Sequence, residues 1–244
     1  MATPDFHFKR CSIQQHGAVH PVGTDAVLLG AWTSIDNTLR ILDIGTGTGV
    51  IALMLAQRTE NVENIRIDAV EIHPGSAACA TRNFAVSPWA DRLRIVTSSI
   101  QDFAQQTDSQ YNLIVSNPPY FSENTKAPDA ARRLGRHIES LPPLEMLRAV
   151  YKLLSPQGRF SVVLPVKEGL KWCEWAVPMG LYWTRITEVF GRKGKPVERL
   201  LIEFQRNPYL FQRDSLIVYE QGVEYSKEYQ EMTREFYLGV EFRG

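Results

Sequence analysis

Short apolar runs and helical patterns alternate along most of the chain. Five runs have the length and continuous apolar character of buried strands, at residues 39–44, 65–70, 93–97, 111–115 and 159–164. Amphipathic segments at residues 50–58, 74–86 and about 144–154 have the spacing of helices. This alternation predicts an α/β fold of the doubly wound, Rossmann-like class, with a mostly parallel sheet and helices on both faces.

The pattern changes after residue 164. A helix is expected from about 168 to 179, and strands at 181–190 and 198–204 are joined by the polar loop 191–196. A strand pair joined by so short a loop is usually antiparallel, so we expect one reversed strand. The tail adds an apolar run at 215–219 and a helical stretch at 226–238. We interpret the aromatic stripe of that stretch as core packing, and it consists of Tyr229, Met232, Phe236 and Tyr237.

The first residues differ from the rest in being polar with interspersed aromatic side chains. They end at a turn before the helical segment 26–32, for which Thr24 or Asp25 is a natural N-cap. We expect a single domain over 1–244, with an N-terminal arm and helix (1–35), a core (36–205), and a C-terminal strand and helix (206–244).

Composition narrows the class of protein. The 244 residues are 44% hydrophobic and 22% charged, which excludes disordered and fibrous classes. Lys+Arg and Asp+Glu both number 27, so any basic surface for nucleic acid has to be local. Cys11, Cys79 and Cys173 lack metal-ligand spacing, so we expect reduced structural thiols and no metal. With no membrane-length apolar run and no signal-peptide pattern, a cytoplasmic enzyme or binding protein is expected. We also expect it to be a monomer.

A candidate functional motif directly follows the fourth predicted strand and reads Ser116-Asn117-Pro118-Pro119-Tyr120. Ligands of open α/β sheets gather at the carboxyl ends of the strands. The Asn117 amide and the Pro118 carbonyl can accept hydrogen bonds, and the Tyr120 ring can stack on a planar group. This set suits a planar amino or amide group. The alternative is an ordinary strand that ends at prolines.

A glycine loop separates the first core strand from the first core helix. Gly45, Gly47 and Gly49 allow close backbone approach to a ligand, but in a G-x-G-x-G spacing that differs from the dinucleotide motif. Asp43 would disfavour a pyrophosphate and suit a positive ammonium group, and Glu71 ends the second strand where an acid can bind ribose hydroxyls. Together they favour S-adenosylmethionine over NAD. The alternative is that both acids only cap helices.

These motifs resemble those of a known family. The segments LDIGTGTG (42–49), AVEIHP (69–74) and SNPPY (116–120) are similar to motifs of class I S-adenosylmethionine-dependent methyltransferases that act on amines. Residues 22–32, Leu53 with 56–59, and 87–90 more closely resemble bacterial methyltransferases that modify adenine 37 of tRNA1(Val) at N6. The resemblance implies a seven-stranded sheet with a reversed last strand, and a tRNA anticodon loop as partner.

The resemblance also implies roles for individual residues. Thr24 and Asp25 would line the methionine side of the cofactor, and Asn117 would hold the target amine beside it. Two departures are visible. Ser99-Ile100, followed by Gln101-Asp102, stands where the family has an acidic and an apolar residue for the adenine, and Pro21 stands where the family tends to have a lysine. Ile100 could still flank the adenine ring.

Two basic clusters are candidates for RNA phosphates. The first cluster follows the SNPPY motif. Between the motif and the cluster stands Phe121, which could share the stacking role of Tyr120. We interpret the first cluster as either a solvated loop or a phosphate-binding lid, and its members are Lys126, Arg132, Arg133 and Arg136. The second lies near the strand pair and consists of Arg192, Lys193, Lys195 and Arg199.

The leading hypothesis is therefore an RNA adenine N6-methyltransferase. A protein-glutamine N5-methyltransferase is the second enzyme hypothesis, because a substrate glutamine amide also presents a planar NH₂ group to Asn-Pro-Pro-Tyr, but that family normally carries a separate N-terminal helical domain. A DNA adenine methyltransferase would usually need a target-recognition domain, which we do not see in the sequence. A noncatalytic RNA or cofactor binder is the fourth alternative, and the intact glycine loop beside Asn117 argues against it.

Overall fold

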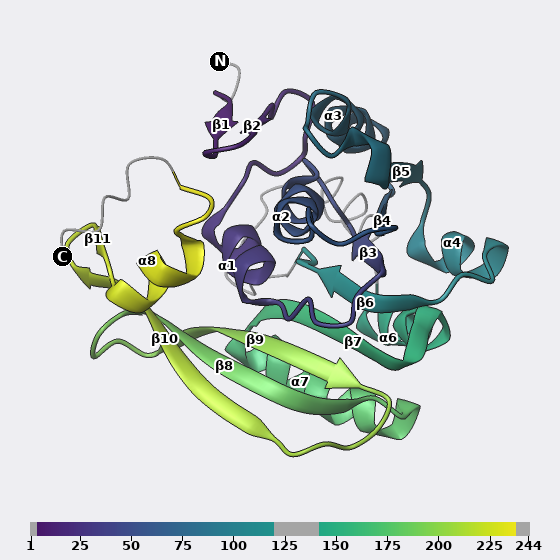
Figure 1. Ribbon diagram of the computed structural model, residues 1–244. Helices are drawn as coiled ribbons and strands as arrows, with labels where there is room; N and C mark the ends of the chain where they lie inside the picture. The colour runs from purple at the N-terminus through teal and green to yellow at the C-terminus, as the bar shows by residue number, and fades with distance from the viewer. Residues whose placement is uncertain (1–3, 120–141, 238–244) are drawn as a thin grey trace, which may run out of the picture.

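The computed structural model describes residues 4–119 and 142–237. Within these ranges, nine strands form one sheet in the order β11-β10-β8-β9-β7-β6-β3-β4-β5 (Figure 1). The strands are β3 (Arg40–Ile44), β4 (Arg66–Glu71), β5 (Leu93–Thr97), β6 (Tyr111–Ser116), β7 (Leu154–Pro165), β8 (Tyr182–Arg192), β9 (Val197–Gln205), β10 (Gln212–Gln221) and β11 (Glu224–Tyr225).

The strand directions confirm the predicted fold class. Strands β5, β4, β3, β6 and β7 pair in parallel with one another, and β9 runs antiparallel to both β7 and β8. These seven strands form the sheet that the family resemblance implies. Strand β10 then pairs in parallel with β8, and β11 pairs antiparallel with β10, so the C-terminal segment widens the sheet by two strands.

Helices cover both faces of the sheet and enclose two apolar cores. On one face lie α1 (Thr24–Trp32), α2 (Val50–Arg58), α3 (Pro74–Ala85) and α8 (Lys227–Thr233). On the other lie α4 (Ile100–Gln106), α6 (Pro143–Leu153) and α7 (Val166–Ala176) (Figure 1). Side chains alternate along β3, so Ile41 belongs to the first core and Leu42 to the second. Asp43 therefore points toward α2.

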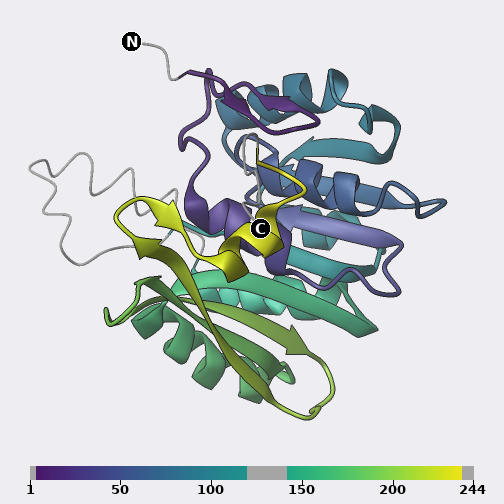
Figure 2. The same cartoon turned by 60° about the vertical axis from the view of Figure 1, so that its left-hand side comes forward.

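The N-terminal arm and the C-terminal tail pack against each other. The arm forms a small hairpin from β1 (Phe6–His7) and β2 (Ser12–Ile13), and the Lys9 N–H donates to the Phe236 carbonyl at 2.7 Å. Phe8 lies near the rings of both Phe236 and Tyr237. Tyr229 and Phe236 are fully buried in the first core, which confirms the interpretation of the aromatic stripe as packing. Figure 2 shows α8 and β11 on the outer side of α1.

The start of α1 differs from the prediction. The helix begins at Thr24, and its N-cap is Gly23, which makes no side-chain cap hydrogen bond. The Gly23 carbonyl accepts from the N–H groups of Ala26 and Val27. The assignment of Thr24 or Asp25 as N-cap is therefore wrong, because both already lie within the first turn.

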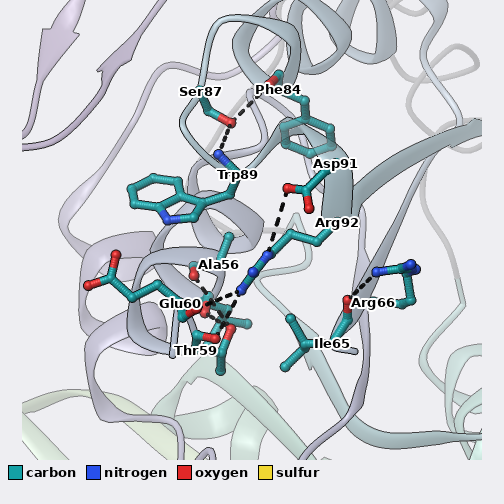
Figure 3. Close-up of polar contacts among 11 residues, drawn as sticks. Ala56, Thr59, Glu60, Ile65, Arg66, Phe84, Ser87, Trp89, Asp91 and Arg92 are labelled. Carbon is teal, nitrogen blue, oxygen red and sulfur yellow. Dashed lines mark hydrogen bonds and ion pairs between the residues drawn. The ribbon is translucent and has the colours of Figure 1, made fainter. Parts of the chain in front are cut away.

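The far ends of α2 and α3 are closed by side chains of the loop before β5 (Figure 3). The Arg92 guanidinium donates to the carbonyls of Thr59 at 3.0 Å and Glu60 at 3.3 Å, just beyond the last turn of α2. Ser87 donates to the Phe84 carbonyl and accepts from the Trp89 N–H. These side-chain bonds add to the backbone bonds that the Thr59 carbonyl accepts from Val62 and the Phe84 carbonyl from Ser87.

The three cysteines are free thiols. Burial raises the pKa of Cys11 to about 11 and that of Cys173 to about 12, and it also raises the pKa of Cys79. Such thiols carry little thiolate near neutral pH, which suits a packing role. In the part of the chain that the structure describes, no helix has the length and apolar character needed to cross a membrane.

Candidate active site

Three of the predicted site residues lie where the central strands end. Ile44 pairs with Val70 on one side and with Ser116 on the other, so Gly45, Glu71 and Asn117 are the next residues out along three adjacent strands. The Ser116 hydroxyl donates to the Ile44 carbonyl at 2.9 Å and fixes the end of β6 against that of β3. The glycine loop and the Asn-Pro-Pro motif therefore share one edge of the sheet.

The glycine loop is a tight turn with an open outer surface. Gly45 and Gly47 have φ of +69° and +58°, and a Cβ added at either would meet nothing within 4 Å. Gly49 has φ of +83°, but a Cβ there would lie 2.5 Å from the Phe84 ring. Gly45 and Gly47 thus leave room for a ligand to approach the backbone, whereas Gly49 allows α3 to pack against the loop.

Asp43 ties this loop to α2. One carboxylate oxygen accepts from the Thr46 hydroxyl at 2.6 Å and from the Ala52 N–H at 3.2 Å. The other oxygen is buried and has no hydrogen-bond partner among residues 4–119 and 142–237. Desolvation raises the pKa of Asp43 to about 7, and the two hydrogen bonds partly oppose that rise. An unpartnered buried oxygen suits a ligand that brings a donor.

Glu71 binds the loop from the neighbouring strand. Its carboxylate accepts from the Gly47 N–H at 2.9 Å and from the His73 N–H at 2.8 Å, and the side chain is buried. Each carboxylate oxygen can accept a second hydrogen bond. Asp43 therefore binds a first-turn N–H of α2, as the helix-capping alternative expects, whereas Glu71 binds the loop backbone. Both keep acceptor capacity for a ligand.

Asn117 and Pro118 are half-buried, and Pro119 is exposed. Asn117 thus stands at the boundary between the core and the surface, beside the loop. Several other predicted site residues lie outside the described residues, so their roles stay predictions: Tyr120, Phe121, Lys126, Arg132, Arg133 and Arg136.

The start of α1 reaches the same edge. Arg199 of β9 pairs with Pro165 at the carboxyl end of β7, and its Nε donates to the Asp25 carboxylate at 2.8 Å. Asp25 and Thr24 are consecutive residues in the first turn. Arg199 therefore differs from the other members of the second basic cluster, because its guanidinium forms an ion pair with Asp25.

Ser99 and Ile100 lie just beyond β5, next to Glu71. The Ser98 N–H donates to the Glu71 carbonyl at 3.1 Å, which sets this position. The Ser99 hydroxyl donates to the Asp102 carboxylate at 2.7 Å and accepts from the Asp102 N–H at 3.0 Å, so Ser99 caps α4. Ile100 is buried in the second core. Their predicted contact with an adenine stays a prediction.

The turn between β8 and β9 brings Arg192, Lys193 and Lys195 to the carboxyl edge of the parallel strands. All three are exposed. The Lys195 N–H donates to the Arg192 carbonyl, and Gly194 has φ of +74°, which closes the turn. This part of the second cluster is therefore accessible on the same edge as Asn117.

Comparisons with known proteins identify the family of this chain. The family described as "Methyltransferase small domain" matches residues 22–171. A Flavobacterium psychrophilum protein named tRNA1(Val) (adenine(37)-N6)-methyltransferase is 43% identical over 96% of this chain and 99% of its own. A Bacteroides fragilis protein of the same name is 40% identical over 98% of this chain and 99% of its own. This chain belongs to the tRNA1(Val) (adenine(37)-N6)-methyltransferase family.

Solved structures show the same fold at low identity. A predicted O-methyltransferase from Agrobacterium tumefaciens is 18% identical, with a TM-score of 0.65 over 87% of this chain and 96% of that one. A putative rRNA methylase from Clostridium thermocellum is 16% identical, with a TM-score of 0.54 over 76% of this chain and 99% of that one. The Rossmann-like methyltransferase fold and the family membership predicted from the motifs are thus confirmed.

Sequence reasoning missed one residue that supports the site. Asn83 of α3 is buried, and its amide donates to the Thr48 carbonyl in the glycine loop at 2.8 Å. A lone asparagine inside a helical pattern gives no sign of this contact. Its helical spacing predicts only that it lies on the inner face of α3.

Proposed function

We propose that this protein transfers a methyl group from S-adenosylmethionine to the N6 amine of adenine 37 in tRNA1(Val). The observation that carries the proposal is the pairing of Ile44 with Ser116, which sets Asn117 directly beside the glycine loop. An amide that can hold an amine thereby adjoins a loop that can hold a cofactor. The names of the relatives supply the RNA and the position.

The residues at the edge fit S-adenosylmethionine on three counts. The backbone at Gly45 and Gly47 is open to a ligand, and one Asp43 oxygen is buried without a partner in the described structure. Glu71 keeps acceptor capacity for ribose hydroxyls. In this proposal Thr24 and Asp25 line the methionine side, and Ser99 and Ile100 flank the adenine. When bound, the cofactor supplies a methyl group on a positively charged sulfur.

The protein's part in the transfer is to orient a poor nucleophile. The lone pair of an adenine N6 amine is delocalised into the ring, so free adenine reacts slowly. If the Asn117 side-chain oxygen and the Pro118 carbonyl accept hydrogen bonds from the two N–H groups of the amine, the nitrogen can become tetrahedral and direct its lone pair at the methyl carbon. With the cofactor bound, the amine held by Asn117 and Pro118 would take the methyl group from the sulfur, which would become neutral, and would release one proton to water.

The substrate side of the proposal combines stacking with phosphate contacts. Tyr120 and Phe121 would stack on the extruded base, which contributes about 1–3 kcal/mol per base in single-strand binders. Arg192, Lys193 and Lys195 are exposed on the same edge and can meet phosphates. The cluster of Lys126, Arg132, Arg133 and Arg136 would add to them. An unpaired anticodon-loop purine needs little unstacking energy.

The test is methyl transfer to separate acceptor pools. Purified protein is mixed with methyl-labelled S-adenosylmethionine and with tRNA, rRNA, DNA or protein. We expect label in tRNA alone, and label in N6-methyladenosine after digestion to nucleosides. Label in a protein glutamine would instead support the N5-methyltransferase, and binding of cofactor without label in any pool would support a noncatalytic binder.

A further inference from the structure

Asn83 connects three segments that lie far apart in the sequence. Its amide nitrogen donates to the Thr48 carbonyl at 2.8 Å and to the Gln14 carbonyl at 2.9 Å. Its amide oxygen accepts from the Gln14 N–H at 2.9 Å. The side chain is only 1% exposed, so these bonds form in a low-dielectric interior where a missing partner is costly.

On the loop side, Asn83 and its neighbour Phe84 act together. Asn83 fixes the carbonyl of Thr48, and the Phe84 ring fills the space beside Gly49. Both contacts hold the last two residues of the glycine loop, directly before α2. The shape of the loop therefore depends on α3 as well as on its own glycines.

On the other side, Asn83 fastens the N-terminal arm through the arm's residues 14–22. Both backbone groups of Gln14 pair with the Asn83 amide, as they would with a neighbouring strand. The Gln15 side chain then accepts from the Val22 N–H at 2.6 Å and holds the other end of the arm. That end leads directly into Thr24 and Asp25.

Further contacts keep the arm close to α3. The Arg82 guanidinium donates to the His16 carbonyl at 2.7 Å, and the Val19 N–H donates to the Ser76 hydroxyl at 3.1 Å. A Cβ added at Gly75 would lie 2.8 Å from the Gly17 carbonyl oxygen, so the arm crosses the first turn of α3 where only glycine fits. The arm is thus seated on the same helix that supports the loop.

We infer that Asn83 is a positioning residue that couples the N-terminal arm to the glycine loop and so sets the affinity for the cofactor. This rests on the proposed function, in which the loop and the start of α1 hold opposite sides of the cofactor. Asn83 joins the two sides through side-chain bonds to Thr48 and Gln14. Aspartate cannot replace it, because a carboxylate has no donor for the two carbonyls.

The test compares Asn83→Ala with Ser87→Ala. Ser87 is a buried polar residue just after the same helix, and its hydroxyl donates to the Phe84 carbonyl without touching the loop or the arm. We measure S-adenosylhomocysteine affinity by calorimetry, the KM for S-adenosylmethionine, kcat, and hydrogen exchange. For Asn83→Ala we expect the dissociation constant and KM to rise about 10- to 100-fold, with kcat within about twofold. Ser87→Ala should keep both constants within about twofold.

Hydrogen exchange separates positioning from general destabilisation. Asn83→Ala should accelerate exchange in both the arm and residues 45–49, whereas Ser87→Ala should accelerate neither. If Asn83→Ala does not fold, Gln15→Ala releases the arm from its other end, and it too should weaken S-adenosylhomocysteine binding. Unchanged affinity in the folded variant would overturn the inference. A wild-type protein that binds no S-adenosylhomocysteine would instead overturn the proposed function.

Discussion

Arg199 Nε lies 2.8 Å from the Asp25 carboxylate and joins β9 to the first turn of α1. The two side chains are about a third and a fifth exposed, so solvent screens the pair. Its contribution to the free energy of unfolding should therefore stay below about 1 kcal/mol. Because Asp25 adjoins Thr24 at the proposed methionine side, the pair matters more for placing α1 than for holding the fold.

Arg199→Ala should raise the KM for S-adenosylmethionine about 5- to 10-fold and change the free energy of unfolding by less than about 1 kcal/mol. Steady-state kinetics and urea unfolding measure the two effects. The matched control is Arg213→Ala, which breaks an arginine–glutamate pair between β10 and β8. An equal rise in KM for both variants would remove the positioning role of Arg199.

The raised pKa of Asp43 predicts how the stability of the protein changes with pH. The unfolded chain loses this proton near the ordinary pKa of 3.8, whereas the folded protein keeps it until about pH 7. Folding therefore binds a proton between these values, and the contribution of Asp43 to stability falls as pH rises through that window. Urea unfolding at pH 5 and pH 7.5 should show a smaller loss for Asp43→Asn than for the wild type. Identical losses would mean that Asp43 ionises normally in the folded protein.

Alanine substitutions at Gly47 and Gly49 should have different effects, one on ligand binding and the other on stability. Gly49→Ala places a methyl group against Phe84 at a positive φ, so we expect a loss of about 2 kcal/mol or more in the free energy of unfolding. Gly47→Ala meets open space and should cost about 1 kcal/mol of backbone strain, but its methyl group should obstruct the ligand and abolish S-adenosylhomocysteine binding. Calorimetry that finds normal binding by Gly47→Ala would place the cofactor elsewhere.

Asn117→Ala should lower kcat by at least about 100-fold and leave S-adenosylhomocysteine affinity within about threefold. The amide serves the target amine in this account, so its loss affects transfer more than cofactor binding. Asn112→Ala is the control, because Asn112 lies at the opposite end of β6 and accepts from the Leu39 and Arg40 N–H groups. Its kcat should stay within about twofold. Retention of transfer by Asn117→Ala would rule out the proposed amine contact.

Much of the fold could be predicted because the core strands are continuous apolar runs. The predicted run 93–97 coincides with β5. Strands β3, β4 and β6 begin and end within one residue of the predicted runs. Several short elements were missed for a physical reason. Helix α4 and strands β1, β2 and β11 are too short for a period to show. Strand β7 begins at Leu154, because an irregular register carries the pairing through a polar stretch that contains Pro156 and Gly158.

The sequence could predict members of the candidate site whose residue type suits one task, but not those whose role depends on contacts made in the folded chain. The glycine spacing and Asn117 follow directly from the motifs. Arg199 lies near a basic run in sequence, but the strand directs it to Asp25. In the family-like segments 56–59 and 87–90, Thr59 and Ser87 take part in contacts at the ends of α2 and α3 (Figure 3).

The most direct test of the central claim is the nucleoside content of tRNA1(Val) from cells that lack this protein. Mass spectrometry should show that N6-methyladenosine at position 37 disappears, returns with the wild-type gene and does not return with Asn117→Ala. Other RNAs should keep their methylated adenines. An unchanged tRNA1(Val), together with loss of a methylated glutamine from a protein, would contradict the account and support the N5-methyltransferase instead.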